Sequence, residues 1–577
     1  MSVKCSRRQQ QRSPLLHEGG FTMLITLGVL LVTSLLLVAA FLAAEGDIGL
    51  SHHNANFKQA YYAAVAGIQE YADHLQLEPN YWETCPRLVN VSIGSKSAPE
   101  TYTVEPLPAE HPTTGTEASH CEVKNVFASM IERAGSATGG SFRIEATGKA
   151  GESKRKVIAT FKQSGFLNYV YFTNYEDEAP ELEKGDSPAC KEAYYDVRQE
   201  MQLKCKEIEF ASGDSVFGPM FTDDAAEICG KVVFGRTGHN PPDTVEMGEG
   251  AHAASGCKNE AEYFDKAKSD LNKNEPEATK EKLEPPESDG SLTTYVLKEA
   301  NNDYEFDGLT HIVLKGGTIQ VTNASLNGGQ PETIEWPENG LIYVKSSSES
   351  ACGYAFGENY EKQDLDTKAE EEAEASCGTV YVEGFYAKPL TIAAEHDVVI
   401  DGHILPSAIS KEGEAPPASD TATLGLIANE YVRVYHPIEE ECKTVTSFTG
   451  GAFGGLGGKG GKPIEETICK QTNKNGSGKL IEPWIYAAIL TTRGSFIVDN
   501  YDKGSGSELG DLNVYGAIAQ NYRGIVGTPA SNGNGAATGY LKNYIYDERL
   551  AVDEPPYFLQ PLNAEWKVVR ETAASEG

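Results

Sequence analysis

The most regular pattern in the sequence is an uninterrupted apolar run near its start. Residues 21–44 contain no charged side chain, and a run of this length crosses a bilayer as one α-helix. Apolar side chains then recur every three or four positions from Phe57 to Leu75, which predicts an apolar stripe on a continuing helix. Pro79 is expected to stop it. We therefore predict one nearly continuous helix over residues 21–77, roughly 85 Å long.

The spacing of apolar residues changes after this helix. Segments 141–147 and 156–161 alternate apolar and polar residues on either side of a glycine-containing turn, which predicts a β-hairpin. A third strand is expected near residues 102–104. We expect residues 79–165 to form a small α+β region whose sheet packs on the apolar stripe of the helix.

The remainder of the chain, residues 166–577, is dominated by short apolar segments separated by turns and long insertions. Five segments share a pattern of short strand, polar turn and second short strand: 218–228, 384–392, 425–434, 488–498 and 516–526. Stacked coils would bury alternate apolar residues that no single coil buries alone. A right-handed parallel β-solenoid with inserted loops is therefore predicted, and a β-sandwich is the alternative. The aromatic and proline-rich segment 553–566 is expected to cap the last coil, because exposed strand edges invite aggregation.

Charge orients the molecule. Residues 1–20 carry four basic side chains and one acidic, a charge of +3, whereas the whole chain has 49 basic and 84 acidic residues, or −35. The basic flank is expected to stay cytoplasmic and the acidic body to lie outside. Nucleic acid is excluded as the main partner, because phosphate binding needs basic patches. The apolar run is too long for an ordinary cleaved signal peptide, although Ala43 and Ala44 offer a cleavage site for that alternative.

Cysteine usage agrees with export. Cys5 lies on the cytoplasmic side, and an even number of cysteines follows the apolar run, which is typical of disulfides. Sequence alone does not fix the connectivity of ten cysteines. The simplest prediction pairs them in sequential couples: Cys85 with Cys121, Cys190 with Cys205, Cys229 with Cys257, Cys352 with Cys377, and Cys442 with Cys469. The last two couples bracket an acidic stretch, 358–374, and a glycine run, 450–461. No C-x-x-C spacing occurs, which argues against a zinc cluster.

The start of the apolar run carries a more specific signal. Residues 18–24 read EGGFTML after a basic leader, and this resembles the processing site of type IV pilins and pilin-like proteins. The resemblance implies that a prepilin peptidase cuts after Gly20 and methylates the new N-terminal Phe21. Residues 59–67, QAYYAAVAG, are similar to the end of the helix shared by minor pilins. The resemblance covers about the first 78 residues.

One position departs from the pilin pattern. Most pilins have Glu at the fifth mature position, where this chain has Ile25. In the family that Glu is thought to meet the N-terminal amine of a neighbouring subunit, so its absence argues against a major shaft role. The chain divides into a cytoplasmic leader (1–20), a transmembrane and stalk helix (21–78), a small pilin-like region (79–165) and a large β-rich head (166–577). We expect a minor or tip subunit of a pilus or pseudopilus, with membrane lipid and other pilin-like subunits as partners and a head for adhesion or assembly.

Candidate chemistry is sparse. A membrane-anchored β-helix enzyme acting on polysaccharide is the alternative function, and Asp223, Asp224 and His239 are its best support, because paired carboxylates serve as general acid and base. A solvated turn explains the same residues. The stretch 455–460 fits G-x-G-x-x-G but is followed by Pro463 instead of a helix. A calcium site in 358–374 is a further alternative. We predict no catalytic residue, cofactor or metal site, and no enzyme activity.

Overall fold

The computed structural model describes the chain between Phe21 and Ala573. Within that span the description leaves out residues 79–80, 94–99, 109–119, 124–125, 130–140, 164, 183–187, 240–241, 255–276, 279–281, 300–301, 348–374, 418, 449–462, 474–479, 531–535, 552 and 563–565. The leader with Gly20, the acidic stretch 358–374, the glycine run and the G-x-G-x-x-G stretch therefore lie outside the described residues.

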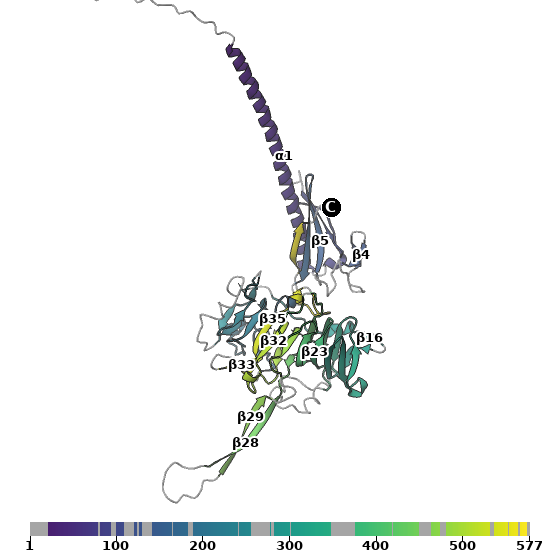
Figure 1. Ribbon diagram of the computed structural model, residues 1–577, viewed down its shortest axis with the longest axis vertical. Coiled ribbons are helices and arrows are strands. Elements are labelled where there is room, and N and C mark those ends of the chain that lie inside the picture. The colour runs from purple at the N-terminus through teal and green to yellow at the C-terminus, as the bar shows by residue number, and fades with distance from the viewer. Residues whose placement is uncertain are drawn as a thin grey trace, which may run out of the picture.

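A single long helix leads into the molecule. Helix α1 (Phe21–Leu77) covers the range predicted from the apolar pattern. Its first half projects away from everything else, and its second half lies against a small sheet (Figure 1). The backbone amide of Glu78 still donates to the carbonyl of His74, and helical hydrogen bonding ends there.

The small sheet is antiparallel and has five strands in the order β1-β2-β5-β6-β36. Strands β5 and β6 form the predicted hairpin, and β2 covers the predicted third strand. Its strands are β1 (Leu88–Ile93), β2 (Glu100–Pro106), β5 (Ser141–Ala150), β6 (Ser153–Gln163) and β36 (Trp566–Ala573). A separate hairpin joins β3 (His120–Val123) and β4 (Val126–Ser129).

Strand β36 departs from the predicted domain boundary. It comes from the C-terminal segment, which the sequence pattern places in the head, and it pairs antiparallel with β6 at the edge of the small sheet. Trp566 reaches the aromatic core there and lies edge-on to Phe142. The segment before it also differs from the predicted end cap. Pro555, Pro556 and Phe558 lie against the sides of the strands around Gly340 and Gly425. The chain therefore enters and leaves the head through the small sheet.

The head is built from parallel ladders. The longest has the order β18-β22-β24-β26-β30-β32-β7-β10-β13-β15, and every neighbouring pair in it is parallel. All five repeated segments of the sequence contribute to it. Its strands are β18 (Glu305–Asp307), β22 (Leu341–Lys345), β24 (Leu390–Ala394), β26 (Leu424–Ala428), β30 (Trp484–Thr491), β32 (Asp511–Tyr522), β7 (Tyr171–Tyr175), β10 (Met220–Thr222), β13 (Val245–Met247) and β15 (Glu277–Ala278).

Further parallel ladders flank this one. The first runs β19 (Thr310–Gly316), β23 (Val380–Tyr386), β25 (Val398–Pro406), β27 (Val432–Val434) and β31 (Phe496–Val498). The second continues from β32 through β35 (Leu541–Tyr546), β9 (Ser215–Phe217) and β12 (Val233–Phe234). The third joins β8 (Phe210–Ala211), β11 (Ala226–Cys229) and β14 (Ala251–Ala253). Apolar side chains from these strands meet in one large core.

The head also contains antiparallel strand pairs, a short helix and several 3₁₀ turns. Antiparallel pairs are formed by β20 (Thr318–Asn323) with β21 (Glu332–Glu335), β16 (Lys298–Glu299) with β17 (Asn302–Asp303), β28 (Ile438–Phe448) with β29 (Pro463–Asn473), and β33 (Gly527–Pro529) with β34 (Ala536–Gly539). The β28–β29 arm extends from the head on the side away from α1 (Figure 1). Helix α2 (Tyr195–Met201) is short. The 3₁₀ turns are η1 (Tyr81–Thr84), η2 (Phe166–Asn168), η3 (Pro188–Cys190), η4 (Gly290–Thr294), η5 (Asn327–Gly329), η7 (Gly506–Glu508) and η8 (Glu548–Ala551).

The order of the long ladder does not follow the chain. The chain enters it in the middle at β7, proceeds to β15 at one end, and restarts at β18 at the other end before closing against β7 through β32. Residues 282–297, the return segment, make that crossing along the side of the ladder. The amide of Leu283 donates to Asp223 just after β10, and the amide of Asp289 donates to Asn429 just after β26. The return segment thus ties distant coils together.

Candidate functional site

The first half of α1 is apolar and uncovered. Met23–Leu42 is the one segment among the described residues that is long and apolar enough to cross a membrane, and none of it is buried within the chain. Its large side chains are more than half exposed, including Ile25. Side-chain hydroxyls on this stretch are satisfied locally, because Thr26, Thr33 and Ser34 donate to backbone carbonyls three or four residues earlier. Such bonding suits a lipid or helix-packed environment without water.

The second half of α1 is fixed on the small sheet by small residues. Ala60 and Ala64 are fully buried, and a Cβ built on Gly148 of β5 would lie 1.9 Å from the Ala60 carbonyl oxygen. Helix and strand backbones are therefore in direct contact. Farther along, Ile68 and Tyr71 complete the core between helix and sheet.

The predicted apolar stripe is only partly buried. Its C-terminal members pack into the core, whereas Phe57 and Tyr61 remain on the surface with exposed fractions of 38% and 40%. The guanidinium of Arg155 lies over the Phe57 ring, with its carbon 3.2 Å from the ring centre. Tyr62 beside it is 66% exposed. The helix thus presents aromatic side chains outward just below its apolar half.

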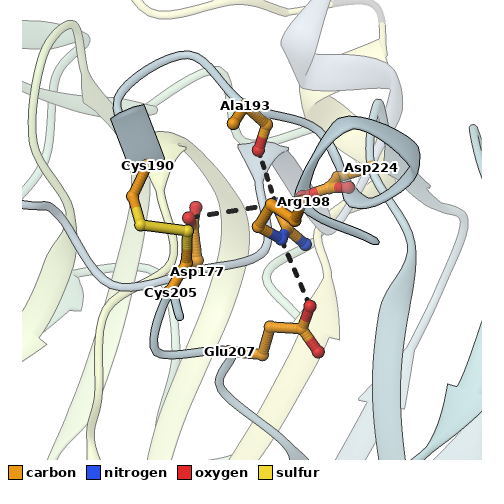
Figure 2. The surroundings of a disulfide bond; sticks show 7 residues. All are labelled: Asp177, Cys190, Ala193, Arg198, Cys205, Glu207 and Asp224. Carbon is orange, nitrogen blue, oxygen red and sulfur yellow. Dashed lines mark hydrogen bonds and ion pairs between the residues drawn. A yellow bond between two sulfur atoms is a disulfide. The ribbon is translucent and has the colours of Figure 1, made fainter. Parts of the chain in front are cut away.

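The structure places the predicted disulfide cysteines as follows. Cys190 and Cys205, one of the five predicted couples, form a disulfide with an S–S distance of 2.10 Å (Figure 2). Cys85, Cys229, Cys377 and Cys442 are also disulfide-bonded. Cys442 on β28 lies directly opposite Cys469 on β29 in the strand register, and Cys121 is in β3. Cys257 and Cys352 lie outside the described residues, so the other four couples stay predictions. Of the predicted processing site, Phe21 begins α1.

A buried charge cluster lies next to the Cys190–Cys205 disulfide. Arg198 of α2 is 2% exposed, and its Nη1 donates to Asp224 Oδ2 at 2.7 Å and to the Ala193 carbonyl at 2.7 Å (Figure 2). Its Nε donates to Glu207 Oε1 at 3.2 Å. Asp177 is also buried, with Oδ2 3.8 Å from Arg198 Nη1. The Arg198 guanidinium therefore interacts with carboxylates from three segments of the chain, those of Asp224, Glu207 and Asp177.

Burial changes the protonation of Asp177 in this cluster. It raises the pKa of Asp177 to about 8, although the nearby Arg198 acts to lower it. Since the folded pKa lies above the unfolded value, this carboxyl favours folding below about pH 4, and that contribution is lost as the pH rises through about 8. Burial likewise raises the pKa of Asp223 to about 8. The hydrogen bond that the Leu283 amide donates to this carboxylate lowers the pKa, but by less than burial raises it.

The structure also shows the contacts of Asp223, Asp224 and His239, the residues that best support the alternative enzyme function. Asp223 and Asp224 are fully buried, which differs from the solvated turn considered for them. Asp224 accepts from Arg198, from the Glu176 amide and from the Tyr195 amide. His239 has other partners, since its Nε2 lies 2.8 Å from Glu548 Oε1. Both aspartates therefore accept hydrogen bonds from within the chain. Asp223 accepts from the return segment, and Asp224 accepts from Arg198 of α2.

A second group of side chains near the cluster, with ligand-type atoms close together, was not found from the sequence. Glu207, Glu227 and His252 are half-buried, and their ligand-type atoms all lie within 4.8 Å of one another. Glu227 on β11 and His252 on β14 are direct register partners on parallel strands. The same 25-residue offset relates β10 to β13. That offset was the available signal, but the repeats found in the sequence had irregular spacing and did not reveal it.

One pocket of about 320 Å³ opens beside this region, lined among others by Lys206, Tyr501 and Lys542. Its buried charge is paired internally. Lys542 Nζ lies 2.6 Å from Asp214 Oδ2, and burial lowers the pKa of the lysine. Lys206 Nζ lies 2.9 Å from Glu178 Oε2. Both lysines that line the pocket therefore already have a carboxylate partner.

Comparisons with known proteins give little guidance. No family model matches the sequence, and no curated protein matches it. Among solved structures, the competence-associated pilin ComZ from Thermus thermophilus is similar at 12% identity, with 90% of this chain and 98% of that chain covered. The TM-score of that match is 0.24, a value that does not establish a shared overall arrangement.

Proposed function

We propose that the chain is a pilin-like surface subunit that is assembled through α1 into a type IV pilus or pseudopilus. The observation that carries the proposal is the division of α1 into two halves. Met23–Leu42 is apolar and wholly uncovered, while the second half is locked on a sheet by direct backbone contact at Gly148. An apolar helix needs lipid or other helices around it.

The unbroken course of α1 from its apolar half to its packed half favours a subunit that assembles with others over a domain that is only tethered to the membrane. Because α1 continues without a break from the apolar half into the packed half, the small sheet has a fixed orientation relative to the apolar half (Figure 1). A tether would need no such coupling. Exposed Tyr61 and Tyr62 at the junction are suited to contact neighbouring subunits, since aromatic residues are enriched at interfaces.

The head is proposed to act by display and binding. Its parallel ladders favour a β-solenoid with inserted loops over a β-sandwich, because sandwiches are built from antiparallel sheets. The partners are membrane lipid before assembly, other pilin-like subunits in the fibre, and a prepilin peptidase at Gly20. The localisation is the cytoplasmic membrane, with the acidic body outside, and then the cell surface. No catalytic role is proposed.

The mature N-terminus tests the proposal. Intact-mass and N-terminal peptide analysis of the chain from membranes and from sheared surface material is expected to show a methylated Phe21. Substituting Gly20→Val is expected to leave Met1 in place. Gly28→Val is the matched control, because Gly28 lies in open space on the apolar half and its change leaves processing intact. A wild-type chain that still begins with Met1 would contradict the proposal.

A further inference from the structure

Glu207, Glu227 and His252 converge from three separate stretches of chain. Side chains at matching positions of adjacent parallel strands share one face about 4.8 Å apart, which brings Glu227 of β11 beside His252 of β14. Glu207 reaches them from the segment that follows Cys205, where it forms a β-bridge with Asp177. That segment is held by the Cys190–Cys205 disulfide and by Arg198. The three side chains are thus set on fixed backbone.

The distances match a small divalent cation. His252 Nε2 and Glu207 Oε2 are 3.3 Å apart. Two ligands of a tetrahedral Zn²⁺, each about 2.0–2.1 Å from the metal, are separated by roughly 3.3 Å. The Glu227 carboxylate oxygen lies within 4.8 Å of the other two ligand atoms, and it has to approach them to about the same 3.3 Å separation to complete the set.

The electrostatics of the group also call for a cation. His252 Nε2 is buried and has no hydrogen-bond partner, although it faces a carboxylate. Glu227 has the acidic side chains of Glu207 and Glu209 as neighbours, together with the imidazole of His252 and the guanidinium of Arg523. The Arg198 guanidinium engages Glu207 through the other carboxylate oxygen, so that Oε2 remains directed at the histidine.

We propose that Glu207, Glu227 and His252 bind one divalent transition-metal ion, with Zn²⁺ preferred. The imidazole nitrogen selects against Ca²⁺ and Mg²⁺, which take oxygen ligands. Three protein ligands leave a coordination position open to water, and the half-buried side chains give access to it. The ion joins the segment after Cys205 to β11 and β14, and so reinforces the end of the head that the disulfide already braces. The rival arrangement is a metal-free ion pair between protonated His252 and Glu207.

Metal titration of the full-length chain separates the two arrangements. The chain is purified in detergent without a histidine tag, stripped with chelator and titrated calorimetrically with Zn²⁺ alone. We expect about one ion per chain, and we expect Glu227→Gln and His252→Ala each to weaken binding at least about tenfold, the scale seen when metal sites lose supporting groups. The matched controls Glu332→Gln, a half-buried acid on β21, and His53→Ala, an exposed histidine on α1, are expected to bind as the wild type does.

Two results would overturn the site. One is the absence of stoichiometric Zn²⁺ uptake, and the other is uptake that Glu227→Gln and His252→Ala leave unchanged. X-ray absorption of the Zn²⁺-loaded wild-type chain needs no variant to fold. A shell of one imidazole nitrogen with oxygens supports the site, whereas sulfur ligands or an all-oxygen shell contradicts it. Binding of Ca²⁺ in preference to Zn²⁺ would contradict it as well.

Discussion

Arg198 is a single side chain on which several buried acids depend. It is enclosed with Asp224 and Asp177, and removing one member of a buried charge set leaves the others uncompensated. Arg198→Met is therefore expected to lower the free energy of unfolding of the head by about 3–5 kcal/mol. Differential scanning calorimetry of the full-length chain measures this as a lower transition temperature.

The matched control is an arginine on the surface. Arg493 has a 52% exposed side chain and pairs with Glu430 at 3.2 Å. Exposed pairs contribute about 0–1 kcal/mol, so Arg493→Met should barely move the transition. Equal effects of the two substitutions would show that the buried cluster has no special weight.

Asp289 makes the return segment sensitive to pH. It is fully buried, and burial raises its pKa to about 7 despite its bonds to Tyr343 and Asn429. A raised folded pKa stabilises the folded chain most below about pH 4, and the contribution is lost as the pH rises toward 7. The loss is at most about 4 kcal/mol, from three units of pKa.

Asp289→Asn isolates this contribution, because asparagine keeps the shape and stays neutral. The stability difference between Asp289→Asn and wild type is expected to shift in favour of the variant between pH 4 and 7 and to stay constant above pH 8. Unfolding measured across that range checks the sign. A difference that is flat with pH would mean that Asp289 ionises in the folded chain as it does in water.

The contact between α1 and β5 depends on one missing side chain. A Cβ at Gly148 would lie 1.9 Å from the Ala60 carbonyl oxygen and 2.4 Å from the Ala64 amide nitrogen. Gly148→Ala must therefore push the helix from the sheet, at about 1–3 kcal/mol for overpacking. Hydrogen exchange of β5 and of the packed half of α1 is expected to accelerate.

Gly317, between β19 and β20, provides the comparison. Nothing lies within 4 Å of a Cβ built there, so Gly317→Ala should alter stability by less than about 0.5 kcal/mol. If Gly148→Ala left exchange in α1 unchanged, the helix would be anchored by the aromatic core around Tyr71 alone.

Local periodicity explains which parts of the fold were predictable. The helix and the β5–β6 hairpin each depend on the spacing of apolar residues within one short stretch of sequence, and both lie where that spacing predicts them. Strand β36 was assigned to the head because nothing near residue 566 records that its partner is β6, some 400 residues earlier. The Arg198 cluster and the group of Glu207, Glu227 and His252 were missed for a different reason, because the irregular spacing of the repeats did not reveal the 25-residue offset between neighbouring strands. Their members meet through the register of neighbouring strands and through the bridge between Asp177 and Glu207.

The arrangement of the chain in the head has a consequence for its integrity. Strand β7 enters the long ladder between β32 and β10, so the two blocks of coils meet at a seam formed by residues 171–175 and 518–522. Buried Arg523 donates to Glu176 at 2.6 Å beside this seam. The seam and the return segment join the two blocks of coils within the head, and β36 ties the C-terminal part of the chain to the small sheet, so the first and last parts of the chain depend on each other.

For the pilin-like subunit proposed above, the size of the head bears on its position in the fibre. In a helical pilus the N-terminal helices pack in the centre and the heads tile the outside, so a head of this size is hard to repeat along a shaft. At the tip no subunit lies above, and its size is unconstrained. Ile25 agrees with this, because a tip subunit has no neighbouring amine above it to pair with a carboxylate. An unpaired Glu there would be unfavourable by at most about 2.5–3.5 kcal/mol, the value for a charged side chain at the centre of a membrane helix.

We therefore predict a low-copy tip or initiating subunit. Immunogold labelling of sheared fibres with antibodies to the head should mark fibre ends, and dense labelling along the shaft would rule the position out. Ile25→Glu should bring no gain in the amount incorporated, since no partner amine awaits the new carboxylate. Ile25→Leu is the matched control for disturbing the same exposed position without adding charge. A large gain with Glu but not with Leu would show that the subunit has a neighbour above it and belongs in the shaft.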